Sequence, residues 1–245
     1  MNILGVIPAR YASTRFPAKP LIDIGGKTMI QRVYEQACKA TQLTKVIIAT
    51  DDERIYNHAL AIGANVCMTA TTHLSGTDRC AEAVQQQTEA YDVVINIQGD
   101  EPFIHPQQIN ELALCFANPA TQIATLVKQI TNVEDLVSTT VMKVALTNTL
   151  QALYFSRNAI PYMRGVPMAN WLNQHTYYKH IGIYGFRANT LCEVTALAPS
   201  TLELTESLEQ LRWLQNDYKI QVAITELESA SIDTPEDLLK IAHLY

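Results

Sequence analysis

Short apolar runs alternate with amphipathic stretches through the first half of the chain. Ile3–Ile7, Lys45–Ala49 and Val93–Ile97 are rich in Val and Ile, as strands buried on both faces tend to be. Between these runs, Met29–Ala40 and Glu53–Ile62 place apolar residues on one helical face. This alternation predicts an α/β fold with a mostly parallel, Rossmann-like sheet and helices on both of its faces.

The second half of the chain is less regular. Its connection Gln151–Tyr178 is long, polar and rich in aromatic residues. Thr234 begins a capping pattern, with proline at the first position of the helix that follows and an acid three residues after the cap. We predict strands at Thr140–Leu146, Lys179–Phe186 and Gln221–Thr225, and helices at Leu204–Gln215 and Pro235–His243.

Composition limits the class of protein. Hydrophobic residues make up 48% and charged residues 17% of the 245 positions, which is typical of a packed soluble protein. No apolar run approaches the roughly 20 residues of a membrane span, and Met1–Ile7 fits a first strand better than a signal peptide. The five cysteines lack Cys-x-x-Cys spacing, which favours a reducing cytoplasm. A net charge of −6 argues against a nucleic-acid surface.

A basic loop follows the first predicted strand. Ligands of open α/β sheets bind at the carboxyl ends of strands, so the loops after Ile7 and Ile97 are the first candidates for chemistry. The first of these loops carries Arg10, Arg15 and Lys19 between prolines that limit its freedom. Such cations suit a triphosphate. A solvated loop whose cations only aid solubility is the alternative, and charge count does not decide between the two.

Two nucleotide-binding motifs are absent from the sequence. Gly25-Gly26-Lys27-Thr28 resembles the end of a P-loop, but Leu21 stands where that motif requires glycine. We therefore interpret Gly25-Gly26 as a turn into the next helix. The first strand is also not followed by Gly-x-Gly-x-x-Gly, which disfavours an NAD-binding oxidoreductase.

Two aspartates are candidate metal ligands. Asp100 follows a buried-looking strand and would face the basic loop, where a carboxylate can hold Mg²⁺ against phosphate oxygens. A turn aspartate that bonds its own backbone explains Asp100 equally well. Asp233 precedes the final helix, and local helix-entry chemistry is the stronger explanation from its sequence alone.

Several blocks of sequence resemble those of one family. They are Ile7–Leu21, Ala49–Ile55, Cys67–Thr69, Ser75–Arg79, Asn96–Pro102, Ala152–Arg157, His180–Gly185, Leu208–Arg212 and Ile232–Leu238. In the same order they are similar to blocks of the CMP-KDO synthetases, or 3-deoxy-manno-octulosonate cytidylyltransferases. The resemblance implies a nucleotide-diphospho-sugar transferase type of fold. It also implies one cytidylyltransferase domain over residues 1–245, with a dimerisation and sugar-binding subregion at approximately 130–190.

The resemblance further implies a cytoplasmic homodimer that uses CTP, KDO and Mg²⁺ in lipopolysaccharide synthesis, without a nucleic-acid partner or membrane insertion. Its implied catalytic residues are Asp100, Lys19 and Arg15. The nucleotide would be held by Ala9, Arg10, Ser13, Arg15, Lys19, Ser75, Gly76, Gln98 and Asp100, and the metal by Asp100 and Asp233. The residues that would bind the sugar are Arg157, His180, Tyr184, Glu209 and Gln210.

Two positions depart from the family pattern. Ala18 stands where the family usually has glycine, and Leu204 or Thr205 where it commonly has histidine. Taken alone, His180 also fits a structural histidine, Tyr184 a half-buried strand residue and Glu209 an ion-pair partner of a cation such as Arg212. Two other functions stay open at this point: a cytidylyltransferase for another acid sugar, either a sialic acid or an amino-substituted KDO, and a non-catalytic nucleotide-binding protein.

Overall fold

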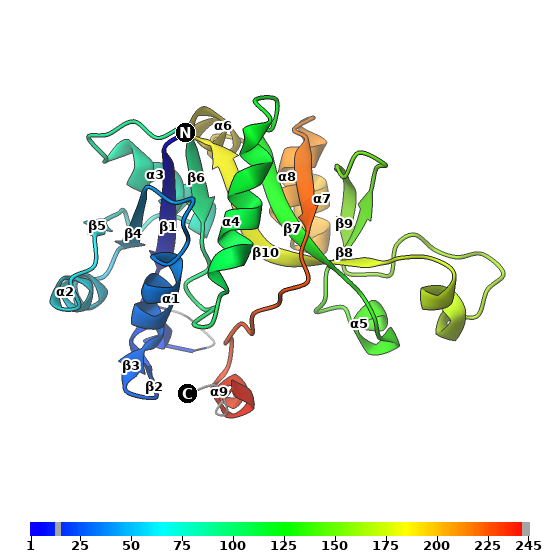
Figure 1. Ribbon diagram of the computed structural model, residues 1–245, viewed down its shortest axis with the longest axis horizontal. Coiled ribbons are helices and arrows are strands. Elements are labelled where there is room, and N and C mark those ends of the chain that lie inside the picture. The colour runs from blue at the N-terminus through cyan, green and yellow to red at the C-terminus, as the bar shows by residue number, and fades with distance from the viewer. Residues whose placement is uncertain (13–15, 242–245) are drawn as a thin grey trace.

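A mixed sheet forms the centre of the protein, and the computed structural model describes residues 1–12 and 16–241 of the chain. The strand order is β11-β7-β10-β6-β1-β4-β5 (Figure 1). Neighbouring strands are parallel except for β10, which runs antiparallel to β6 and β7. These strands are β1 (Ile3–Ala9), β4 (Lys45–Thr50), β5 (Val66–Met68), β6 (Val93–Asn96), β7 (Ile123–Gln129), β10 (Tyr178–Arg187) and β11 (Ile220–Ile224). The predicted fold class is confirmed.

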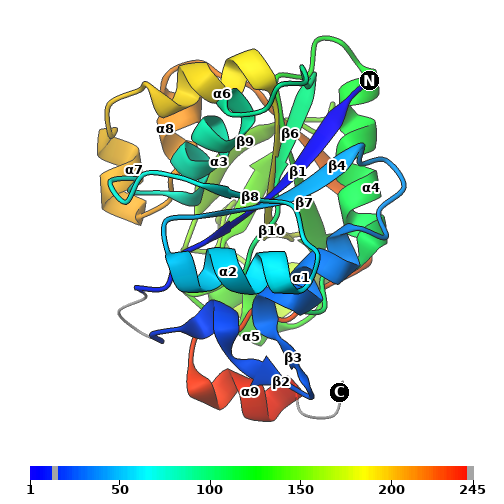
Figure 2. The ribbon, with the colours of Figure 1, turned by 90° about the vertical axis from the view of Figure 1, so that its left-hand side faces the viewer.

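Helices cover both faces of this sheet (Figure 2). Alternate residues of β1 enter two separate cores, Ile3 and Ile7 on one face and Leu4 and Val6 on the other. This explains the unbroken apolar runs, because each strand buries both of its faces. The first core is covered by α1 (Met29–Ala37), α2 (Glu53–Ala61) and α4 (Pro106–Leu114), and the second by α3 (Gly76–Gln85), α6 (Ala188–Thr195) and α8 (Gln210–Gln215).

A small hairpin and the last helix pack together at one end of the molecule (Figures 1 and 2). The hairpin joins β2 (Asp23–Ile24) to β3 (Lys27–Thr28) through Gly25 and Gly26, whose φ angles of 59° and 82° suit a primed two-residue turn. The predicted turn is therefore confirmed. Helix α9 (Pro235–Ile241) is reached through residues 226–234, which we call the strap.

A subregion extends from the other end of the sheet (Figure 1). The segment Gln151–Tyr178 was predicted as a long, polar, aromatic-rich connection. It contains β9 (Ala152–Ser156), which pairs with β8 (Lys143–Leu146), and a 3-10 helix at Met168–Asn173. Trp171 of that helix is buried beside α5 (Val133–Val137) and Tyr177, which forms a satellite core. The polar sequence concealed this core, because only a few scattered apolar residues build it.

The predicted helix Leu204–Gln215 is wrong. The structure has α7 (Thr201–Glu206) and α8 instead, separated at Ser207 with φ of 53°. At the break, the guanidinium of Arg157 donates to the carbonyls of Glu206 and Ser207, which have no helical partner there. Two further 3-10 turns lie at Lys19–Leu21 and Cys115–Ala117.

Within the described residues, none of the helices combines the length and apolar character needed to cross a membrane. All five cysteines lie in the described part of the chain and are free thiols, as their spacing predicts.

Candidate active site

A pocket opens at the carboxyl ends of β1 and β6, where the topology predicts ligand binding. Residues from the basic loop, the β6–α4 loop, the start of α3 and the strap surround it. The lining residues are Pro8, Ala9, Arg10, Lys19, Pro20, His73, Leu74, Ser75, Gly76, Arg79, Gln98, Gly99, Asp100 and Asp233. The described part of the predicted nucleotide-binding set therefore lines one pocket, whereas Ser13 and Arg15 lie outside the described residues.

The two predicted metal ligands converge on one cation. The Lys19 ammonium contacts Asp100 Oδ2 at 2.9 Å and Asp233 Oδ1 at 3.4 Å. It also donates to the carbonyl of Ile232 at 2.9 Å. Asp100 and Asp233 are far apart in sequence, so the fold alone creates this oxygen-rich cation position.

Backbone contacts hold the strap against the β6–α4 loop. The N–H of Ile232 donates to the carbonyl of Asp100 at 2.9 Å. Beside it, the hydroxyl of Ser229 hydrogen-bonds to the carboxyl of Glu101. Burial raises the pKa of Glu101 to about 7, with a smaller contribution from the charge of Asp100. These contacts fix Asp233 opposite Asp100.

Close packing of the loops determines the shape of the pocket floor. A Cβ atom on Gly99 would lie 2.7 Å from the carbonyl oxygen of Pro8, so only glycine fits there. Gln98 donates to the carbonyl of Gly182 at 2.8 Å, which ties the floor to β10. Opposite, Ser75 and Gly76 begin α3 with a capping box formed by Ser75 and Asp78. The amino end of α3 therefore faces the pocket with its positive dipole end.

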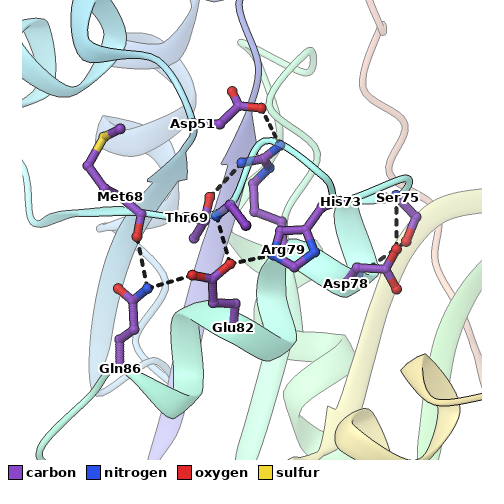
Figure 3. Close-up of polar contacts among 10 residues, drawn as sticks. Asp51, Met68, Thr69, His73, Ser75, Asp78, Arg79, Glu82 and Gln86 are labelled. Atoms are coloured by element: carbon purple, nitrogen blue, oxygen red, sulfur yellow. Dashed lines mark hydrogen bonds and ion pairs between the residues drawn. The ribbon is translucent and has the colours of Figure 1, made fainter.

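Arg79 is a buried cation of the pocket that the sequence analysis missed. Its side chain is 4% exposed and donates to Asp51 at 2.8 Å and to Thr69 at 2.5 Å (Figure 3). These partners follow β4 and β5, so two strand ends hold the guanidinium in place. The helical spacing of Ser75 and Arg79 could have indicated this role. Arg79 lies four residues after the cap residue Ser75 and therefore on the same side of the helix as the pocket.

His73 is also new to the predicted set. It lines the pocket and contacts Glu82 of α3, which accepts from the backbone N–H of Ala70 at 2.8 Å (Figure 3). The Ala70 N–H and His73 lower the pKa of Glu82. The carboxylate thus anchors the loop between β5 and α3, which carries Leu74 to the pocket rim.

Three of the predicted sugar residues gather beneath the start of α3. Thr77 donates to the carboxylate of Glu209 at 2.8 Å. Burial raises the pKa of Glu209, and burial together with the nearby Glu209 charge raises that of Tyr184. The ring of Tyr184 lies 5.0 Å from that of His180. The ion pair of Arg212 is formed with Glu203 at 2.5 Å, not with Glu209 as one alternative had it.

His180 is held as a neutral imidazole. The hydroxyl of Thr125 donates to the carbonyl of Ile183 at 2.7 Å, so it accepts from His180 Nε2 at 2.9 Å. Burial lowers the pKa of His180 to about 3. At neutral pH the ring of His180 is therefore uncharged, and its Nδ1 carries a lone pair that can accept a hydrogen bond.

Comparison with known proteins identifies the family. A family model described as cytidylyltransferase matches residues 4–221. The chain is 57% identical over 244 residues to a 3-deoxy-manno-octulosonate cytidylyltransferase of Parabacteroides distasonis, with 98% of this chain and 96% of the relative covered. A relative of the same name from Bacteroides thetaiotaomicron is 56% identical, with 97% and 96% covered. This chain belongs to the 3-deoxy-manno-octulosonate cytidylyltransferase family.

A solved structure agrees with this placement in the 3-deoxy-manno-octulosonate cytidylyltransferase family. A CMP:2-keto-3-deoxy-manno-octonic acid synthetase complexed with CTP matches with a TM-score of 0.92 and 38% identity, over 100% of this chain and 98% of that one. A cytidylyltransferase from Leptospira borgpetersenii has a TM-score of 0.63 at 16% identity, over 97% and 83% of the chains, and shares the fold.

Ala18, where the family resemblance implies glycine, has an unusual backbone conformation. Ala18 adopts φ of 60°, a left-handed conformation that glycine accepts more easily than alanine. A glycine at position 18 would therefore relieve backbone strain.

Two predicted sugar residues differ from the others in their surroundings. Arg157 donates to the carbonyls of Glu206 at 2.7 Å and Thr139 at 3.0 Å, so its guanidinium braces the end of α7. Gln210 is 5% exposed at the start of α8. Leu204, at one position where this family commonly has histidine, is 67% exposed on α7.

Proposed function

We propose that this enzyme transfers CMP from CTP to the anomeric hydroxyl of KDO and releases pyrophosphate. The main support is that Asp100 and Asp233 both contact one cation, Lys19, beside the basic loop. The chain also matches 3-deoxy-manno-octulosonate cytidylyltransferases along nearly its whole length. The sugar oxygen attacks the α-phosphorus of CTP, and the bond to the β-phosphate oxygen breaks. The hydroxyl proton passes to solvent water, and the electron pair of the broken bond leaves with pyrophosphate.

The residues of the pocket suit these charges. Arg10 and Arg79 supply donors for phosphate oxygens, and the start of α3 adds its positive dipole end. Lys19 neutralises charge on the departing pyrophosphate once its carboxylate partners take another cation. Positioning and charge neutralisation contribute most of the rate enhancement, since the protein forms no covalent bond in this reaction.

The donor set fits a magnesium ion. No three His, Cys, Asp or Glu side chains of the described residues form a metal cluster, but two carboxylates already surround one cation position. Hard oxygen ligands are what Mg²⁺ prefers, and phosphate oxygens and water would complete its shell. We assign Asp100 and Asp233 as its ligands. Mg²⁺ held there would polarise phosphate oxygens and lower the pKa of the attacking hydroxyl.

We further propose a cytoplasmic homodimer that serves lipopolysaccharide synthesis. Free cysteines suit a reducing compartment. Leu153 and Tyr162 of the extended subregion are 60% and 76% exposed, which suits a covering partner subunit.

A sugar panel tests the substrate directly. Purified enzyme with CTP and Mg²⁺ is offered KDO, amino-substituted KDO and a sialic acid, and pyrophosphate release is followed. We expect the highest kcat/KM with KDO. A higher value with another acid sugar would reassign the substrate, and absence of pyrophosphate with all of them would contradict catalysis.

A further inference from the structure

Two buried polar atoms beside the pocket have no partner among the described residues. They are Oδ1 of Asn96 and the phenolic oxygen of Tyr184. The side chains belong to residues that are only 4% and 8% exposed. An unsatisfied buried polar group costs about 1–3 kcal/mol, so we expect ordered water or a bound ligand to pair with these two atoms.

The fold places these two residues side by side. Asn96 ends β6, and its register partner on the antiparallel β10 is Tyr184. Directly opposed residues of such a pair project from the same face, with Cβ atoms about 5 Å apart. Here that face is the one covered by α3 and α8.

The same place adjoins both the nucleotide pocket and Glu209. A Cβ atom on Gly76 would lie 3.6 Å from Nδ2 of Asn96 and 3.2 Å from Pro8, so the missing side chain leaves Asn96 beside the pocket wall. On the other side, the hydroxyl of Thr77 of α3 donates to the carboxylate of Glu209 and holds it near this place. An amide, a phenol and a carboxylate thus gather around the start of α3, beside the pocket wall.

We propose that Asn96 is a sugar-specificity residue whose carboxamide, with the phenol of Tyr184, pairs with neighbouring hydroxyl groups of the acid sugar. The inference rests on the proposed function and adds a residue to it. An amide and a phenol each donate and accept, as a hydroxyl does, so they satisfy adjacent hydroxyls in either orientation. A site built this way rejects a substrate that lacks one hydroxyl, because its own buried groups then stay unpaired.

Asn96→Ala and Asn96→Leu test this inference through two readouts. We expect KM for KDO to rise at least about tenfold while KM for CTP stays within about twofold. The melting temperature should be unchanged or higher in Asn96→Leu, because an unpaired polar group is removed from an apolar surround. Tyr184→Phe should raise the KM for KDO in the same way. In the Asn96 and Tyr184 double variant, the loss of KDO binding free energy should be smaller than the sum of the two single losses.

A KDO analogue that lacks one ring hydroxyl supplies the second arm. Wild-type enzyme should prefer KDO over at least one such analogue by about tenfold or more, and Asn96→Ala should lose that preference. If folded variants keep the wild-type KM for KDO, or if both KM values rise together with a lower melting temperature, the inference is overturned. Wild-type enzyme that releases no pyrophosphate from CTP and KDO would instead contradict the proposed function.

Discussion

At the scale of single residues, backbone conformation and burial explain what the sequence could only indicate. Ala18 and Ser207 both occupy left-handed conformations, one in the basic loop and one between α7 and α8. Alanine and serine rarely adopt this conformation, so it could not be predicted from residue type. The sequence therefore indicated no strain at Ala18 and predicted an unbroken helix through Ser207. Pocket residues within a recognised block were predicted more easily, although buried Arg79 was missed.

Ala18→Gly should stabilise the protein by up to about 1 kcal/mol. Relief of the left-handed strain, about 1–2 kcal/mol, is partly offset by the greater freedom of glycine in the unfolded chain. Urea denaturation measures the change. Ala12→Gly, in the same loop but without a positive φ, is the matched control and should be neutral or destabilising. Equal effects of the two variants would contradict this explanation.

His180→Gln should change the pH dependence of stability. The pKa of His180 is about 3 in the fold and about 6.5 in the unfolded chain, so its neutral form contributes stability that is full above about pH 6.5 and is lost as pH falls. Between about pH 6.5 and pH 5, the free energy of unfolding should fall by about 1–2 kcal/mol more in wild type than in the variant. Denaturation at both pH values tests this, since other groups titrate alike in the two proteins. Identical losses would show that His180 is not buried as a neutral ring.

At the scale of elements, the strap matters most for the site. It carries Asp233 from β11 to α9, and its contacts with Asp100, Glu101 and Lys19 join distant parts of the sequence. Strand and helix positions followed from apolar periodicity because each buries one or two continuous faces. The strap has no such periodicity, so the sequence placed Asp233 only through its family resemblance.

Lys19→Met should strengthen divalent-cation binding in the absence of CTP. The Lys19 ammonium occupies the position between Asp100 and Asp233, and its removal takes away one positive charge that competes with a divalent cation for these carboxylates. We expect the Kd for Mn²⁺, measured by calorimetry, to fall about tenfold, which corresponds to about 1.4 kcal/mol. CTP should bind more weakly.

The matched control is Lys27→Met, which removes a cation paired with Glu35 away from the pocket. It should leave Mn²⁺ binding unchanged. A Lys19→Met protein that is folded and binds Mn²⁺ as wild type does would argue against Asp100 and Asp233 as the cation ligands.

At the scale of the whole molecule, the order of strands and helices in the first half predicted the α/β architecture correctly. The antiparallel insertion of β10 between β6 and β7 was not predictable from local pattern, since pairing partners lie far apart in sequence. The satellite core around Trp171 was not predicted either, because its few apolar residues are scattered over separate segments of the sequence.

The exposed apolar residues of the extended subregion predict a dimer. Light scattering in solution should give twice the chain mass of 27.3 kDa. Replacing Leu153 and Tyr162 together by Asp should shift the protein toward monomers, because charges oppose burial of that surface. A wild-type monomer at micromolar concentration would contradict the proposed homodimer.

The most direct test of the account is the rate of pyrophosphate release by Asp100→Asn with saturating CTP, KDO and Mg²⁺. The exchange keeps the shape of the side chain and removes its charge, so the protein should fold with an unchanged melting temperature. We predict a loss in kcat of at least about 100-fold, or about 3 kcal/mol of transition-state stabilisation. Turnover close to wild type in this variant would contradict the role of the paired carboxylates and with it the proposed chemistry of the pocket.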